Sequence, residues 1–115
     1  MRDDIAYLRH ILDGIARIES YSSGGRGAFL AQPLIQDAVL RNLHTLSEST
    51  QRLSDRLKAA YPQVPWEDIS GFRNVLVHDY MMIDLLRIWR IVQHSLPELK
   101  PQAQEMLADL GGVER

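Results

Sequence analysis

The spacing of apolar residues is the feature that most limits the fold of this chain. Leucine, isoleucine and valine recur three, four or seven positions apart along each long segment, which is the period of one helix face. No segment alternates apolar and polar residues over a useful length, and no hairpin dipeptide joins two such runs. The sequence therefore predicts an all-α fold, an up-and-down bundle of four to five helices.

Glycine and proline residues mark the expected helix ends in the first half. A first helix is predicted over residues 3–21, because Ser22–Gly25 follows and glycine favours a C-terminal cap. Residues 27–32 are expected to form a short helical turn. A long second helix should begin at Pro33, where no backbone N–H is needed, and run to about Ala60.

Prolines also divide the second half. The two prolines in residues 61–65 predict a rigid connection, and the second of them should open a third helix. Asp84 is expected to cap a fourth helix that ends at Pro97. A weaker fifth helix should follow to Leu110, with Pro101 breaking or delaying its start because an interior proline loses a hydrogen bond.

Small and polar residues interrupt the apolar stripe of the second helix. Asn42, Ser49 and Thr50 stand at positions close to the core. Local hydrogen bonds to the helix backbone are the simpler explanation. The alternative is that these side chains line a cleft together with Glu48.

Composition narrows the class of protein. A chain of 115 residues predicts one domain over residues 1–115. The absence of cysteine excludes disulfides, zinc ribbons and a thiol nucleophile. A net charge of -2 argues against a broad basic coat for nucleic acid, but it does not exclude a small local patch that grips one or two phosphates. Arg87 and Arg90, on the exposed face of the fourth predicted helix, could add local positive charge. The charged start and the lack of a long apolar run predict a cytoplasmic protein with no membrane contact.

One stretch, Gly71 to Tyr80, concentrates chemically active side chains. It carries Arg73, Asn74, His78, Asp79 and Tyr80. On a continuous helix Arg73 and Tyr80 would return to within about 20° of each other, whereas Arg73 and His78 would differ by about 140°. A helix end near His78 would relax that angle. The glycine costs about 1 kcal/mol relative to alanine, so it could mark a helix crossing or a subunit contact.

Several kinds of chemistry are conceivable for this stretch. A metal site is not expected, because His78 and Asp79 are adjacent and the other histidines are scattered, and no cofactor is expected. Metal-free cleavage of RNA fits better: His78 suits proton transfer, Arg73 suits a charged transition state, and Asn74 could orient the phosphate or the imidazole. From these residues alone, an exposed polar face or an ion-pair cluster explains the spacing more simply.

The same residues resemble a known family. Arg73, four residues and then His78-Asp79-Tyr80 match the R-x4-6-H-x-Y pattern of HEPN-domain proteins. Further segments across about residues 3–108 are similar to the HepT branch, also known as the DUF86 family. These are Asp3–Asp13, Ile35–Leu43, Tyr61–Trp66 and Leu96–Leu99. Two segments depart from that branch, namely Leu46–Ser49 and Met81–Asp84.

The resemblance implies a HEPN fold and a toxin of a type VII toxin–antitoxin system with ribonuclease activity. It implies a homodimer in which the motifs of both subunits meet in a cleft, with Arg73 and His78 as the catalytic pair and Asn74 and Tyr80 in support. It also implies an MntA-like nucleotidyltransferase antitoxin that transfers AMP to Tyr80. The departures bear on substrate preference and on modification. The alternative is a non-catalytic helical module that presents substrate to a nucleotidyltransferase.

Overall fold

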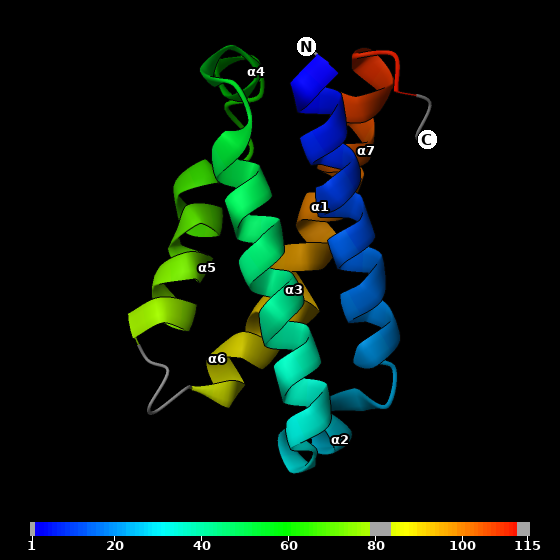
Figure 1. Cartoon of the computed structure of the whole chain (residues 1–115), viewed down its shortest axis with the longest axis vertical. Coiled ribbons are helices and arrows are strands. Elements are labelled where there is room, and N and C mark those ends of the chain that lie inside the picture. Colours follow the sequence, from blue (N-terminus) through cyan, green and yellow to red (C-terminus); the bar gives the residue numbers. More distant parts are fainter. Residues whose placement is uncertain (1, 79–83, 113–115) are drawn as a thin grey trace.

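The computed structural model describes residues 2–78 and 84–112, and within them all regular structure is helical (Figure 1). The elements in chain order are α1 (Arg2–Tyr21), α2 (Gly25–Ala31), α3 (Pro33–Arg52), α4 (Asp55–Ala60), α5 (Trp66–His78), α6 (Leu85–Arg90), the π-helical segment η1 (Ile91–Ser95) and α7 (Leu96–Asp109). The predicted all-α fold is confirmed.

The longer helices form an up-and-down bundle. Helix α1 packs against α3 and α7, and α3 also packs against α5. Segments α6, η1 and α7 follow one another as a single long helical stretch. The short helices α4 and α2 lie at opposite ends of the bundle, and α2 contacts α3 and α6 (Figure 1).

The core of the bundle is one cluster of buried side chains. Helix α1 supplies the stripe that its sequence predicts, with Leu8, Ile11, Ile15 and Ile18 all fully buried. At the α2 end the rings of Phe29 and Trp89 pack with centroids 5.3 Å apart. None of the helices in the described part of the chain combines the length and apolar character needed to cross a membrane.

The prediction of a single helix from Pro33 to Ala60 is wrong. Helix α3 ends at Arg52, and Leu53 is extended, with ψ 144°. Ser54 then caps α4, since its side chain accepts a hydrogen bond from the Leu57 N–H. The buried carboxylate of Asp4 accepts from the Ser54 N–H at 2.8 Å and from its hydroxyl at 2.6 Å. If α3 continued, the Ser54 N–H would bond to a carbonyl of that helix. It bonds to Asp4 of α1 instead.

The prediction that Pro97 ends a helix and that Pro101 breaks the next one is also wrong. Helix α7 runs from Leu96 through both prolines to Asp109. The preceding η1 segment shifts bonding to the wider π register, where the Leu96 N–H donates to the Ile91 carbonyl. Both prolines lie on the exposed side of α7, so water can solvate the carbonyls that lack a donor.

Two of the three polar residues noted inside α3, Asn42 and Thr50, bond locally, as the simpler explanation predicts. The Asn42 amide donates to the Ala38 carbonyl at 2.8 Å, and the Thr50 hydroxyl donates to the Leu46 carbonyl at 3.0 Å. Thr50 is fully buried and Ser49 nearly so. The bonded side chains of Asn42 and Thr50 therefore belong to the packing of α3, not to a cleft.

Candidate active site

The start of α5 is fixed by side chains that join it to the α4 end of the bundle. The Trp66 indole N–H lies within hydrogen-bonding distance of two carbonyls, at 3.2 Å from that of Lys58 and 3.1 Å from that of Tyr61. Tyr61 in turn donates a hydrogen bond to Asp109 of α7. The first turn of α5 is thus anchored to both α4 and α7.

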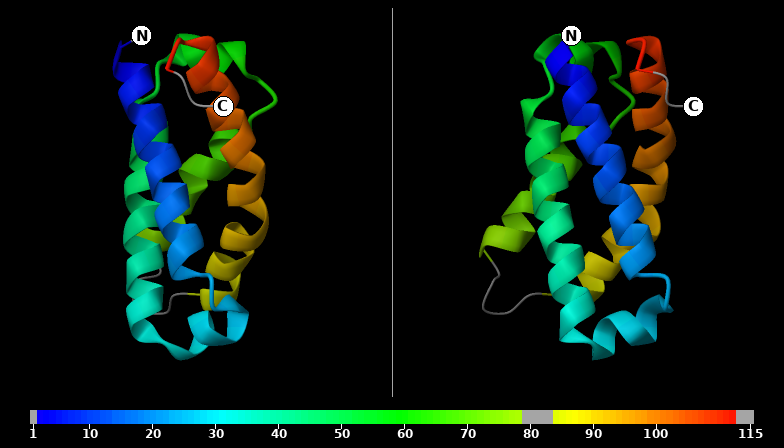
Figure 2. Two further views of the ribbon diagram at one scale, coloured as in Figure 1. Left: turned by 90° about the vertical axis from the view of Figure 1, so that its right-hand side faces the viewer. Right: turned by 45° about the vertical axis from the view of Figure 1, so that its right-hand side comes forward.

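Farther along, α5 lies against α3 and then leaves the bundle. Ile69 and Phe72 are buried. Toward its C-terminal end the helix projects away from the other elements and stands clear of the bundle (Figure 2). The backbone positions of Arg73, Asn74 and His78 all lie on this projecting part, and His78 is its last residue.

The described part of α5 runs through His78. Asp79 and Tyr80 lie outside the described residues, so the expectation for Tyr80 stays a prediction. Because α5 is helical through residue 78, Arg73 and His78 occupy one continuous helix. Their positions differ by about 140° around the axis and by about 7.5 Å along it.

Two hollows flank the anchored half of α5. One of 440 Å³ lies between α3, α4 and α5, and Trp66, Ser70 and Gly71 contribute to its lining. A smaller one of 90 Å³ lies between α5 and the η1–α7 stretch. A Cβ atom on Gly71 would meet no described atom within 4 Å. The proposed helix crossing at Gly71 is therefore not formed within the described part of this chain.

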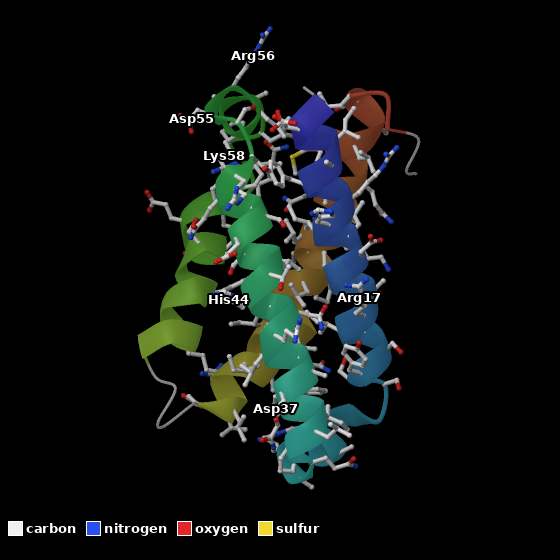
Figure 3. All side chains as sticks on the ribbon, viewed as in Figure 1. Arg17, Asp37, His44, Asp55, Arg56 and Lys58 are labelled. Atoms are coloured by element: carbon white, nitrogen blue, oxygen red, sulfur yellow. The ribbon has the colours of Figure 1, made fainter. Side chains whose placement is uncertain are left out.

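A histidine–carboxylate pair on α3 was not singled out from the sequence. The imidazole of His44 lies 3.6 Å from the Glu48 carboxylate, and both side chains are half-exposed (Figure 3). Their spacing of four residues on a helix was the available signal. Helix α3 is the one against which α5 packs. Among the described residues, no three His, Asp or Glu side chains gather as a metal site would require.

Comparison with known proteins decides the family. The family model described as "Ribonuclease HepT-like" matches residues 11–106, which include Arg73, Asn74, His78 and Tyr80. The chain belongs to the HepT-like family. The expected resemblance to this family is therefore confirmed.

Curated relatives of this HepT-like chain carry related names. It is 30% identical over 111 residues to a "Putative RNase" of Caldanaerobacter subterraneus subsp. tengcongensis, covering 93% of this chain and 96% of that protein. A "Probable ribonuclease HepT" of Thermococcus cleftensis is 28% identical over 101 residues, covering 87% and 92%.

A longer relative contains the same unit beside other sequence. It is a "Gamma-glutamylcyclotransferase and putative RNase" of Methanocaldococcus jannaschii, 30% identical over 112 residues. The match takes in 96% of this chain but half the length of that protein. No solved structure matches the chain.

Proposed function

We propose that this HepT-like chain is a metal-independent endoribonuclease and the toxin of a toxin–antitoxin system. The observation that carries the proposal is the family match across the segment that holds Arg73 and His78. The fold supports it, because both residues lie on the part of α5 that projects from the bundle. A long substrate such as RNA can approach that end of the helix.

RNA carries its own nucleophile, so the protein needs only to move protons and balance charge. The 2′-hydroxyl attacks the adjacent phosphorus and gives its proton to a base, while the bond from phosphorus to the 5′-oxygen breaks. The leaving oxygen takes up a proton, which yields a 2′,3′-cyclic phosphate and a 5′-hydroxyl end. His78 is the proton-transfer group, Arg73 stabilises the negative charge that builds up on the phosphate oxygens, and Asn74 orients the phosphate.

A second copy of the chain completes the site in this proposal. Arg73 and His78 of one protomer diverge by about 140°, so one helix does not direct both at a single phosphate. Two projecting α5 helices facing each other would let the arginine of one protomer meet the histidine of its partner. The open space beside Gly71 is in keeping with a close approach of that kind.

Two substitutions test the catalytic assignment. His78→Ala and Arg73→Ala should each slow the cleavage of single-stranded RNA in EDTA by about 100-fold or more, as losing a general acid–base or a charge-stabilising group does. Arg56→Ala, at the far end of the bundle, is the matched control and should keep native activity. Circular dichroism should show unchanged helix content in all three. Native rates in both α5 variants would refute the assignment, and an inactive native protein would favour the substrate-presenting module.

Modification of Tyr80 is the proposed means of neutralisation. A nucleotidyltransferase antitoxin would join the α-phosphate of ATP to the phenol oxygen and release pyrophosphate. The adduct brings negative charge into a site for an anionic substrate and should block RNA. Intact-mass measurement after co-expression with such an enzyme should show one AMP per chain, lost in Tyr80→Phe and retained in Tyr61→Phe. An adduct that survives in Tyr80→Phe would contradict this site.

A further inference from the structure

A basic groove lies at the α2 end of the bundle, apart from the residues assigned to catalysis. It has a volume of 330 Å³ and lies between the start of α2 and the α6–η1 stretch. Its lining consists of Arg26, Leu86, Trp89, Arg90, Gln93 and His94. Four of these six side chains can donate hydrogen bonds from exposed positions, and two of them carry a fixed positive charge.

Helical geometry explains why these side chains share one groove. Leu86, Arg90, Gln93 and His94 are spaced four, three and one residues apart, so they follow one face of the α6–η1 stretch. Gln93 and His94 lie in the π-helical segment, and such segments occur often at functional sites. Arg26 closes the groove from α2, on the opposite side.

The positive charge of this groove is not balanced from within the described residues. No aspartate or glutamate lines it, and neither arginine has an ion-pair partner in the described part of the chain. Glu19 shares a neighbouring hollow with Gln93, but its carboxylate is bound by Lys100 at 3.1 Å. The net charge of the chain is -2, so a local excess of this kind is not a general property of the surface.

We propose that this groove binds the phosphate backbone of the RNA substrate, with Arg26 and Arg90 each contacting a phosphate. The proposal rests on the ribonuclease function above. Seven residues of chain advance from His78 to Leu85 at the start of α6, so the two elements lie at most about 25 Å apart. One single strand can therefore occupy the groove and reach the projecting end of α5, and the groove would hold the strand while cleavage proceeds.

Paired substitutions test this binding without any need for cleavage. The probe is a fluorescent single-stranded oligonucleotide with 2′-O-methyl groups, which lacks the attacking hydroxyl, and its anisotropy reports binding. Arg26→Ala/Arg90→Ala should weaken binding about tenfold and reduce the slope of log affinity against log salt by about 1.4, the value for two phosphate contacts on a single strand.

The control removes the same charge elsewhere. Arg52→Ala/Arg56→Ala alters two exposed arginines near the α4 end, and Figure 3 shows Arg56 pointing away from the bundle there. That variant should bind within twofold of the native protein. Equal losses in both double variants would mean a non-specific charge effect and would overturn the groove. Native affinity in Arg26→Ala/Arg90→Ala would overturn it as well.

A second measurement locates the ligand. The chain has two tryptophans, and Trp66→Phe leaves Trp89 of the groove as the sole indole emitter. The 2′-O-methyl oligonucleotide should change its fluorescence, and the change should disappear in the Arg26→Ala/Arg90→Ala background. A response to inorganic pyrophosphate but not to the oligonucleotide would overturn the RNA assignment in favour of a small-anion site. None of these binding measurements depends on catalysis. A negative result for the groove would therefore leave the ribonuclease proposal standing.

Discussion

The two ends of the bundle are held together in different ways. At the α4 end, side-chain hydrogen bonds join segments far apart in the sequence: Asp4 to Ser54, and Tyr61 to Asp109. At the α2 end Phe29 packs against Trp89, and the Gln36 amide reaches two carbonyls of α2. An exposed ion pair of Lys100 with Glu19 also joins α7 to the end of α1 there.

The two ends also differ in whether their polar and charged side chains are bonded to other parts of the chain. The polar groups of the α4 end are used to connect α1, α4, α5 and α7, and they fix the point where α5 begins. The two arginines of the groove at the α2 end, Arg26 and Arg90, have no carboxylate partner among the described residues, and that end lies beside the projecting part of α5 (Figure 2). One end therefore stabilises the fold, while the other keeps charge available for a partner from outside.

The largest stability effect is expected where a cap is also a long-range contact. Ser54→Ala removes the cap of α4 and deprives the buried Asp4 carboxylate of its hydroxyl donor, so it should lower the free energy of unfolding by about 2–3 kcal/mol. Asp84→Ala is the matched control, because the Asp84 cap also accepts an N–H at 3.1 Å but is exposed and local. It should cost about 1 kcal/mol.

Urea unfolding followed by circular dichroism measures both values. If Ser54→Ala and Asp84→Ala lowered the free energy of unfolding equally, the Asp4–Ser54 contact would add nothing beyond an ordinary cap. That result would contradict the proposed difference between the two ends. A loss for Ser54→Ala that falls to about 1 kcal/mol, the value of the cap alone, in an Asp4→Ala background would show that Asp4 and Ser54 act together.

A smaller effect, dependent on pH, is expected at Tyr61. Desolvation, followed by the hydrogen bond to Asp109 and the negative charges of Asp109 and Glu105, raises the pKa of Tyr61 from 10.0 to about 12. The protonated phenol is thus favoured in the folded state, so its contribution is complete below pH 10 and is lost as the pH rises from 10 towards 12. Tyr61→Phe should cost about 0.5–1 kcal/mol at pH 8 and progressively less above pH 10.

The measurement is unfolding of the native and variant proteins at several pH values. Tyr21→Phe is the control, since Tyr21 is 40% exposed and should show a constant, near-zero difference. A difference for Tyr61→Phe that stays constant up to pH 12 would contradict the role of this hydrogen bond at the α4 end.

Sequence periodicity predicted most of the helices, but it could not predict contacts between distant residues. The stripe of α1, the start of α3 at Pro33 and the cap at Asp84 depend on neighbours within a few positions, and all three are confirmed. The break at Leu53 was missed because Leu53 and Leu57 keep helical spacing across it. The contact that stabilises the break comes from Asp4, 50 residues away.

At the candidate site, too, local features were predicted from the sequence and contacts between distant segments were not. The position of Arg73 and His78 on one helix followed from the spacing. The basic groove did not, although Arg90 had been noted as local positive charge. Arg26 lies between the first predicted helix and the predicted short turn, and only folding brings α2 beside α6.

An effect of similar small size, but of opposite sign, is expected for Gly71 in α5. Gly71→Ala should raise the stability of the isolated chain by about 0.5–1 kcal/mol, because alanine favours the helix and the added methyl group meets no described atom. If a second protomer approaches α5 closely at this point, the same methyl group should weaken the dimer. Gly14→Ala is the control: its methyl group would make ordinary contact with Leu46 inside the bundle, so it should leave dimerisation unchanged. Light scattering over a range of protein concentrations separates the outcomes. A chain that stays monomeric at every concentration would contradict the site shared between two protomers. A dimer that is weakened by Gly71→Ala but not by Gly14→Ala would place the dimer contact on α5.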